Sequence, residues 1–350
     1  MSLKHRMVGA LYRGILKPLL FRVDPEVVHD RFSSLGEALE PLAPLVHAAL
    51  GATHNAPKEV LGVTFKNPIG LSAGFDYDGH LAEIMQAVGF GFNTVGTVTA
   101  QPYEGNPLPR LGRLPKSQSL LVNKGFKSEG AVAVAKRLDA KSLGGHTIGI
   151  SVGSSNIPSV DTMPKAIEDY MKTFEIFRTR SYVSYFELNI SCPNTRLADS
   201  FSTLTQFENL VRELSRLHLA QPVFVKMPNE ITSDKAEALI RAGLPSGIRG
   251  YILGNLVKDR TNAAFDAQEI ADVAELRGNF SGKPTEKSVH RLLETTRKTF
   301  ANDVALIGVG GVFTTEDARA MFAAGADLVQ LITGMIYRGP QVAGEIVSEL

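Results

Sequence analysis

The sequence Asn189-Ile190-Ser191-Cys192-Pro193-Asn194-Thr195 follows an apolar run, residues 185–188, that predicts a buried strand. It contains the only cysteine among 350 residues, with an asparagine on either side, where the strand would give way to a loop. In a barrel of parallel strands, chemistry is done at the carboxyl ends of the strands. A thiol can move a proton there, and two carboxamides can hold a planar polar substrate by its edges.

Seven further apolar runs have the same form, and helical stretches alternate with them. The eight predicted strands are residues 67–74, 92–99, 146–153, 185–192, 222–227, 250–255, 305–311 and 328–333. The predicted helices between them include residues 79–88, 130–138, 162–178, 205–217, 234–242, 288–299 and 315–323. Continuous apolar runs are typical of parallel strands that are buried on both faces. Eight such units predict an α/β fold, a (β/α)8 TIM barrel, with a doubly wound sheet as the alternative.

The first 50 residues have a different character and predict an N-terminal helical domain, followed by a barrel domain over residues 51–350. Residues 25–39 and 44–50 carry helical apolar spacing. Five basic residues precede the first acid, Asp24, and lie among apolar side chains: Lys4, Arg6, Arg13, Lys17 and Arg22. Pro18 is expected to kink or divide this segment. A basic amphipathic helix suits a membrane interface, although it could also dock on its own domain.

Composition excludes several classes of function. The chain is 44% hydrophobic and 21% charged with a net charge of +1, so it is globular and has no large basic face for nucleic acid. One cysteine excludes a disulfide framework and a multi-cysteine zinc or iron–sulfur site. The eight histidines show no metal-ligand spacing, so no metal is expected. No apolar run is long enough for a transmembrane helix.

Glycines after the last two predicted strands indicate a phosphorylated ligand. Gly308-Val309-Gly310-Gly311 ends the seventh strand, and Thr333-Gly334 ends the eighth. Glycines let backbone N–H groups approach an anion, and barrels commonly bind phosphate at these two loops. The pattern does not separate a flavin mononucleotide from a sugar phosphate, and tight turns without a ligand would look the same.

Other candidate residues end the predicted strands or lie in loops. Lys226 could form a Schiff base, could place a cation beside a reduced flavin, or could extend from the strand end to solvent. Cys192 is either a small buried side chain or a catalytic base. Four asparagines predict a site for a heterocycle with carbonyl and N–H edges: Asn123, Asn189, Asn194 and Asn255.

These residues together resemble the dihydroorotate dehydrogenases, most closely their membrane-associated, quinone-dependent class (class 2). The resemblance runs from about residue 11 to the C-terminus. It includes Phe65-Lys66-Asn67-Pro68-Ile69-Gly70-Leu71-Ser72-Ala73-Gly74-Phe75-Asp76 and the heptapeptide quoted above. The other matching segments are residues 19–26, 95–99, 123–126, 280–284, 307–311 and 324–330.

The resemblance implies a barrel that binds FMN, oxidises dihydroorotate to orotate in pyrimidine synthesis and passes electrons to a membrane quinone. Cys192 falls on the position of the base that removes the C5 proton, while hydride leaves C6. The implied flavin contacts are Ala73, Gly74, Tyr77, Thr97, Asn189, Lys226, Gly282, Gly310, Gly311, Thr333 and Gly334. The implied substrate contacts are Asn123, Gly125, Phe126, Asn189, Asn194 and Asn255. The helical N-terminus implies peripheral, monotopic membrane association on the cytoplasmic side.

The chain departs from the family pattern at several positions. The quinone-linked class usually has serine where this chain has Cys192. Tyr77 replaces a lysine that touches flavin and substrate, and Leu256 replaces a polar residue. We expect Lys124 or Lys127 to supply the missing positive charge. The alternatives are a flavin-dependent barrel enzyme with another substrate, a phosphate-binding lyase using Lys226, and a non-catalytic flavin- or membrane-binding homologue.

Overall fold

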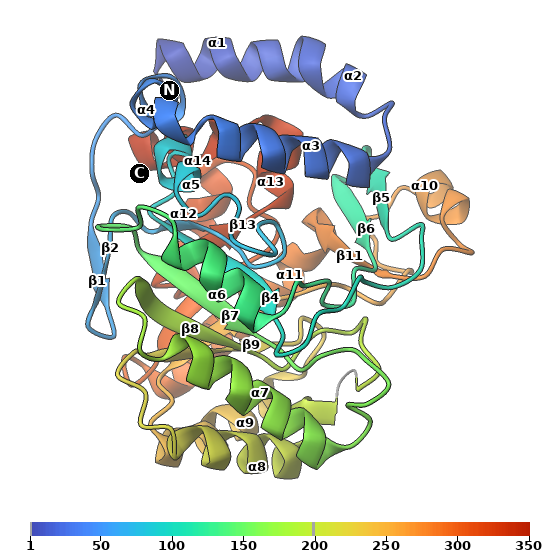
Figure 1. Cartoon of the computed structure of the whole chain (residues 1–350). Coiled ribbons are helices and arrows are strands. Elements are labelled where there is room, and N and C mark those ends of the chain that lie inside the picture. The colour runs from blue at the N-terminus through green and yellow to red at the C-terminus, as the bar shows by residue number, and fades with distance from the viewer. Residues whose placement is uncertain (1, 198–199) are drawn as a thin grey trace.

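All eight predicted strands form, and they close into one parallel barrel in the order β3-β4-β7-β8-β9-β10-β12-β13 (Figure 1). This computed structural model describes residues 2–197 and 200–350. The strands are β3 (Ile69–Leu71), β4 (Phe92–Val98), β7 (Ile148–Val152), β8 (Val183–Asn189), β9 (Val223–Met227), β10 (Gly250–Leu253), β12 (Ala305–Val309) and β13 (Leu328–Leu331). The prediction of a (β/α)8 barrel is therefore confirmed.

The seven predicted helices are present and surround the barrel (Figure 1). Helix α5 is shorter than predicted, because the Asp76 carboxylate accepts a hydrogen bond from Leu81 N–H (3.1 Å) and the residues before Ile84 form turns. The helices are α5 (Ile84–Val88), α6 (Ala131–Asp139), α7 (Met163–Phe177), α8 (Leu204–Ser215), α9 (Ser233–Gly243), α11 (Glu286–Phe300) and α12 (Thr315–Ala323), followed after β13 by α13 (Thr333–Arg338) and α14 (Val342–Glu349).

The apolar core has two layers, one between barrel and helices and one inside the barrel. The inner layer includes Phe92, Tyr185 and Phe224, which alternate along their strands with residues that face the helices. A hairpin of β1 (Lys58–Val60) and β2 (Val63–Phe65) adds Phe65, whose ring lies 4.8 Å from that of Phe92. Aromatic and aliphatic side chains thus form the apolar layer inside the barrel.

The two long connections, residues 100–129 and 256–287, meet in a small sheet that the sequence did not predict. Strands β5 (Leu111–Leu114), β6 (Ser119–Val122) and β11 (Asn279–Gly282) pair antiparallel, with α10 (Ala267–Asp272) beside them. Leu111, Leu120 and Ser281 from this sheet line the main cavity of the molecule. Both connections therefore contribute to the wall of that cavity.

The N-terminal helices lie across the carboxyl-terminal side of the barrel (Figure 1). They are α1 (Leu3–Leu11), a π-helical turn (Tyr12–Leu16), α2 (Lys17–Leu20), α3 (Pro25–Ala38), a 3-10 turn (Glu40–Leu42) and α4 (Ala43–Leu50). The chain stays helical through Pro18, and the wide turn before it closes with a Lys17 N–H to Tyr12 C=O bond. Because proline lacks an N–H, the helix accommodates Pro18 by widening rather than by dividing.

Candidate active site

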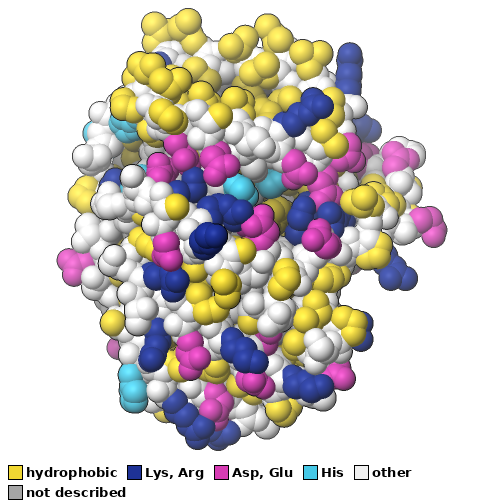
Figure 2. All heavy atoms as spheres, in the orientation of Figure 1, with side chains coloured by type: hydrophobic (Ala, Val, Ile, Leu, Met, Phe, Trp, Pro, Cys, Tyr) yellow, Lys and Arg dark blue, Asp and Glu magenta, His cyan; other side chains and the backbone are white. Residues whose placement is uncertain are grey.

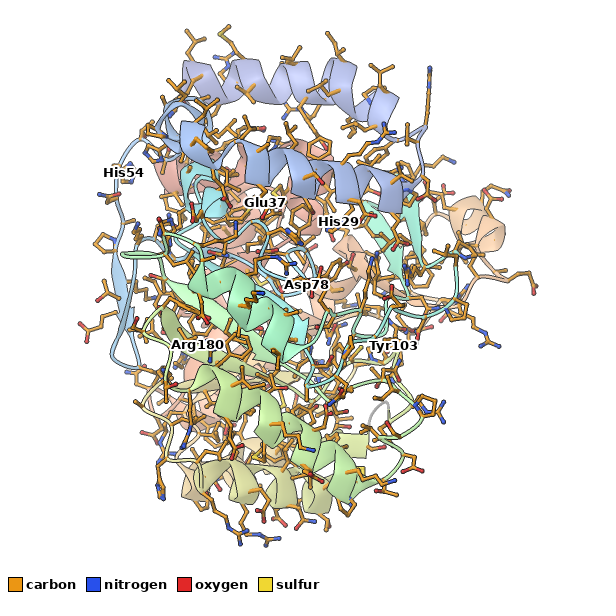
Figure 3. All side chains as sticks on the ribbon, in the orientation of Figure 1. His29, Glu37, His54, Asp78, Tyr103 and Arg180 are labelled. Carbon is orange, nitrogen blue, oxygen red and sulfur yellow. The ribbon has the colours of Figure 1, made fainter. Side chains whose placement is uncertain are left out.

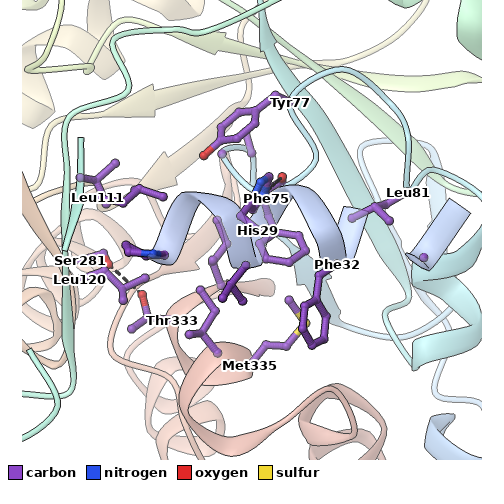
Figure 4. Close-up of a pocket in the computed structure, with 18 of the residues that line it drawn as sticks. His29, Phe32, Phe75, Tyr77, Leu81, Leu111, Leu120, Ser281, Thr333 and Met335 are labelled. Atoms are coloured by element: carbon purple, nitrogen blue, oxygen red, sulfur yellow. Dashed lines mark hydrogen bonds between the residues drawn. The ribbon is translucent and has the colours of Figure 1, made fainter. Parts of the chain in front are cut away.

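One cavity of about 690 Å³ joins the carboxyl ends of the barrel strands to the N-terminal helices (Figure 4). Its inner end carries the polar side chains, and its outer end is apolar. The inner lining includes Ala73, Gly74, Thr97, Asn189, Cys192, Lys226, Asn255 and Thr333. The outer lining includes Val28, Phe32, Leu35, Leu39, Leu45 and Val46 from α3, α4 and the turn between them. A cavity of this size and lining is typical of a ligand site.

At the inner end, hydrogen bonds fix the side chains of two predicted asparagines. Asn189 Nδ2 donates to Thr97 Oγ1 (2.9 Å), and Asn189 Oδ1 accepts from the Ser191 N–H and hydroxyl. Asn255 Nδ2 donates to Ser191 Oγ (2.7 Å). Ser191 therefore links the two amides, so that strands β8 and β10 present them to one cavity in fixed orientations.

Asn106 organises the other two predicted asparagines, although sequence reasoning missed it. Its Nδ2 donates to Asn123 Oδ1 and to the Asn194 carbonyl, both at 2.9 Å. Its Oδ1 accepts from Tyr103 and Asn156. The only sequence feature at this position is the dipeptide Asn106-Pro107, and that pattern predicts no more than a turn. Asn194 lines the cavity, but Asn123 does not, so Asn123 acts here through the loop that it orders.

Lys226 is a buried ammonium at the floor of the cavity. Only 5% of its surface is exposed, and its Nζ donates to Ser72 Oγ at 3.1 Å. Burial lowers the pKa of Lys226, and the negative charges of Glu187 and Cys192 act against this shift. An ammonium has three donors, and among the described residues this hydroxyl is its one hydrogen-bond acceptor. The remaining donors are available to an electron-rich ligand.

Cys192 lies in the loop after β8 and lines the cavity, half-buried. Its charge acts on Lys226 and also on Tyr170, whose pKa is raised, first by burial and then by Cys192. The Tyr170 hydroxyl donates to the Asn189 carbonyl (2.7 Å) at the end of β8. The thiol is therefore close to the cation at the cavity floor, on a strand end that a buried tyrosine holds in place.

Tyr77, which the resemblance places at the position of a family lysine, is enclosed by aromatic and cationic groups. Its ring centroid lies 5.1 Å from that of His29, and Lys124 Nζ lies 5.2 Å from it. His29 extends from α3 toward the barrel and its Nε2 lies 2.7 Å from the Phe75 carbonyl oxygen (Figure 3). Burial raises the pKa of Tyr77, so the phenol stays neutral. Tyr77 therefore brings a ring, and no charge, to the junction of barrel and helices.

Three cations surround one carboxylate beside this ring. Arg110 Nε donates to both Glu26 oxygens (2.8 and 2.9 Å), and Lys124 Nζ lies 2.5 Å from Glu26 Oε1. Lys127 Nζ is farther away, at 3.9 Å. Burial alone would raise the pKa of Glu26, but hydrogen bonds from Arg110 and Lys124 lower it to about 2. The cluster keeps an excess of positive charge next to the cavity, which Lys124 and Lys127 line.

Of the predicted site glycines, Gly74 and Gly125 lie on the cavity wall, and the other four lie around it. Gly125 and the predicted Phe126 line it, whereas Gly282, Gly310, Gly311 and Gly334 do not. A Cβ at Gly310 would lie 2.1 Å from Thr285 Oγ1, and one at Gly334 would lie 2.0 Å from the Val312 carbonyl oxygen. Close packing of the loops after β12 and β13 is therefore one reason for these two glycines. Thr333 does line the cavity, and its Oγ1 lies 2.8 Å from Ser281 Oγ (Figure 4).

Two polar side chains at the outer end of the cavity were also missed. Arg113 Nη1 donates to the Val23 carbonyl (2.7 Å), with its guanidinium 4.7 Å from the Phe21 ring centroid. The Tyr12 hydroxyl donates to the Ile336 carbonyl (2.7 Å). Nothing in their sequence spacing marks them, because segments far apart in the chain bring them to the cavity. They are the polar groups of an otherwise apolar end.

Residues 2–197 and 200–350 contain neither a clustered metal-ligand set nor a membrane-spanning helix. No group of three or more His, Cys, Asp or Glu side chains there is arranged to hold a metal ion. No helix in those residues is both long and apolar enough to cross a bilayer.

The fold and the position of the cavity define a (β/α)8-barrel enzyme with its site at the carboxyl ends of the strands. The chain belongs to the dihydroorotate dehydrogenase family, which it matches over residues 56–350. Enzymes of this family are flavin-dependent oxidoreductases.

Relatives that carry the name dihydroorotate dehydrogenase (quinone) match almost the whole chain. The protein from Roseiflexus castenholzii is 36% identical over 341 residues, covering 95% of this chain and 90% of its own. The protein from Burkholderia cenocepacia is 34% identical over 353 residues, covering 98% of both chains. These full-length matches confirm the assignment to the quinone-dependent class. The solved dihydroorotate dehydrogenase from Eimeria tenella, in complex with ferulenol, superposes with a TM-score of 0.83 at 25% identity, covering 93% of this chain and 90% of its own.

Proposed function

We propose that this chain oxidises dihydroorotate to orotate, with FMN as the hydride acceptor and a membrane quinone as the final electron acceptor, in pyrimidine biosynthesis. One observation carries this proposal. A single cavity begins at Cys192, Asn189 and Lys226 and continues between apolar side chains of α3 and α4. A polar end suits the pyrimidine and the flavin, and an apolar end suits a quinone.

The residues present fit FMN. Lys226 is buried with donors left over, and it would face the electron-rich pyrimidine edge of the flavin. Ala73, Gly74, Thr97 and Asn189 would flank the ring from the ends of β3, β4 and β8. Gly74 has a φ of +106°, which favours glycine, and an added Cβ there would make only an ordinary contact, with Ile332 Cδ1 at 3.8 Å. Thr333 and the loops of Gly282, Gly310, Gly311 and Gly334 would hold the phosphate.

The chain's own residues divide the work of the oxidation. Bound FMN supplies an acceptor for the hydride from C6. Cys192 removes the proton from C5 as a thiolate, so the substrate loses one proton and one hydride in all. Asn189, Asn194 and Asn255 bind the carbonyl and N–H edges of the pyrimidine, with Asn123 ordering their loop. Gly125 and Phe126 close that side of the cavity.

The outer part of the cavity is the proposed path for the quinone. Phe32 of α3 and Leu111 of β5 face it from opposite sides (Figure 4), and Val28 of α3 also lines it. Arg113 and Tyr12 are the polar groups at this end, and they suit the carbonyl oxygens of a quinone head. Residues 2–50 in this proposal form a cap that keeps water from the site and admits an apolar acceptor.

A row of exposed apolar residues on the cap supports peripheral membrane association. Leu3, Met7, Leu11, Ile15 and Leu19 are 71%, 64%, 53%, 56% and 55% exposed. Figure 2 shows apolar side chains gathered over this end of the molecule. In an α-helix, each residue of such a row is rotated by about 40° around the helix axis from the residue four positions before it. The wider π turn at Tyr12–Leu16 offsets part of this rotation, so the row stays on one side of the helix. Soluble surfaces rarely expose such a patch, and basic residues beside it suit anionic lipid.

A second candidate keeps the flavin and changes the substrate. Tyr77 and Leu256 both line the cavity, where they replace a cation and a polar group of the family pattern. A substrate that has no carboxylate for a cation of the protein to bind would suit such a pocket.

An anaerobic titration separates these readings. We expect yellow protein whose oxidised-flavin spectrum is bleached by L-dihydroorotate and restored by a short-chain quinone. A flavin spectrum that dihydroorotate leaves unchanged would support the second candidate or a non-catalytic homologue. Colourless protein that binds no added FMN would exclude the oxidoreductase reading.

A further inference from the structure

Strand β8 carries a buried carboxylate inside the barrel, Glu187, for which the reaction described above has no use. Tyr185, Glu187 and Asn189 alternate along β8, and all three are buried. Tyr185 belongs to the apolar layer inside the barrel, and Asn189 lines the cavity above it. Because side chains two residues apart share one face of a strand, Glu187 also faces the barrel interior, one layer below the site.

The strand register places Glu187 beneath Lys226. Asn189 of β8 pairs with Lys226 of β9, and Glu187 pairs with Phe224, two residues below Lys226. No direct ion pair joins the two side chains, so their charges act on each other through space. In a dry interior such an interaction is much stronger than at a surface.

Neutral groups hold the Glu187 carboxylate in place. Its Oε1 accepts from Thr94 Oγ1 and from Gln330 Nε2, both at 2.7 Å, and Tyr185 donates to the same threonine hydroxyl (2.7 Å). Its Oε2 has no hydrogen-bond partner among the described residues. A glutamine could accept the same two hydrogen bonds, so the network alone does not explain why this position carries a charge.

We propose that Glu187 is a positioning residue of the site: its carboxylate is the buried counter-ion that keeps Lys226 protonated at the floor of the cavity. The inference rests on the proposed function because it assumes a bound flavin. The interaction between Glu187 and Lys226 can nevertheless be tested without substrate. An isolated ammonium in a dry barrel would lose its proton. Burial lowers the pKa of Lys226, and the negative charge of Glu187 acts in the opposite direction and raises it. A permanent cation at this point stabilises the reduced, anionic flavin.

The first test is the pH dependence of the flavin reduction potential in Glu187→Gln, measured in a Cys192→Ala background. Among the described residues, the titratable groups that act on Lys226 are Glu187 and Cys192; Ser72 of the loop after β3 is neutral, and Ile252 of β10 is apolar. With Glu187 present, Lys226 stays protonated in both flavin states. In Glu187→Gln, reduction should draw an extra proton to Lys226, so the potential should fall more steeply with rising pH. An unchanged slope would overturn the proposal.

Thr94→Val is the matched control for the network. It removes the hydroxyl that binds Glu187 Oε1 but keeps the carboxylate charge. We expect it to lower the unfolding temperature while leaving the slope of potential against pH as in the parent. A slope changed as much as in Glu187→Gln would assign the effect to packing and would contradict a counter-ion role.

A double-mutant cycle keeps the proposal testable if Glu187→Gln folds poorly. Glu187→Gln leaves a buried cation alone, Lys226→Met leaves a buried carboxylate alone, and the double variant leaves neither. We expect the double variant to lose several degrees less in unfolding temperature than the sum of the single losses, with or without added FMN. Losses that simply add would overturn the pairing. If the parent chain bound no flavin but the cycle showed coupling, the proposed function alone would fail.

Discussion

Lys124 and Glu26 form a buried ion pair, with Nζ 2.5 Å from Oε1, that joins the loop after β6 to helix α3. The side chains are 5% and 12% exposed. Arg110 binds the same carboxylate from the barrel side. The pair therefore fixes the helical cap to the barrel beside the cavity, and it assigns different tasks to the two lysines that the sequence offered for the substrate carboxylate. Lys124 already has an anion, whereas Lys127, at 3.9 Å from Glu26, is only loosely held.

Lys127→Ala should weaken dihydroorotate binding more than any other lysine substitution in this loop. The Lys127 side chain is 28% exposed and lines the cavity, so its ammonium can meet a carboxylate without breaking a short ion pair. We expect KM for dihydroorotate to rise about tenfold, equivalent to about 1.4 kcal/mol. Lys116→Ala is the control, because Lys116 is 67% exposed and pairs with Asp266 on the surface. Unchanged KM values in Lys127→Ala and Lys124→Ala would refute a role for either lysine.

Acid should loosen the cap through Glu26. Its pKa is about 2 in the folded chain and 4.5 ordinarily, so its stabilising contribution is complete above about pH 4.5. The contribution is lost as the pH falls toward about 2. Glu26→Gln should cost about 2 kcal/mol near neutral pH, because Arg110 and Lys124 lose their anion. Thermal unfolding of both forms at several pH values should show this difference shrinking in acid. A difference that is the same at pH 6 and pH 3 would contradict the assignment.

The barrel could be predicted because each strand is a continuous apolar run that ends in a turn residue, as in Leu188 and Asn189. The small sheet could not, since β6 and β11 pair across about 160 residues and their sequences are short. Asn189 and Cys192 were predicted from their places at the end of a strand and in the loop that follows it. Asn106, Arg113 and Glu26 were not, because their partners come from distant segments and only the folded chain brings them together.

The pH profile of flavin reduction should report the thiol at Cys192. A thiol has an ordinary pKa of about 8.5, so the thiolate fraction, and with it the rate, should rise from pH 6 toward that value. Cys192→Ala should slow the step by about 10²- to 10⁴-fold and abolish the rise. Cys192→Ser tests whether a hydroxyl, usual in the quinone-linked class, can replace the thiol. Stopped-flow reduction by dihydroorotate from pH 6 to 9 measures both effects, and a flat profile for the parent would contradict a thiolate base.

The apolar row on the cap should determine binding to lipid. Met7→Glu combined with Ile15→Glu places two charges on side chains that are 64% and 56% exposed. We expect co-sedimentation with vesicles of phosphatidylglycerol and phosphatidylethanolamine to fall at least tenfold, while anaerobic reduction by dihydroorotate stays unchanged. Val132→Glu is the matched control, because Val132 is 69% exposed but lies on α6, away from the cap. Equal loss of binding in the control would mean that the row is not the contact surface.

Narrowing the outer cavity should slow the quinone without affecting the substrate. Val28 lines the cavity from α3, whereas its neighbour Val27 is 42% exposed on the same helix and lies outside it. Val28→Trp adds a bulky ring to the proposed path, so reoxidation of the reduced flavin by a short-chain quinone should slow at least tenfold. Val27→Trp should reoxidise at the parent rate, and both variants should be reduced by dihydroorotate as fast as the parent. Equal reoxidation rates in the two variants would place quinone access elsewhere on the molecule.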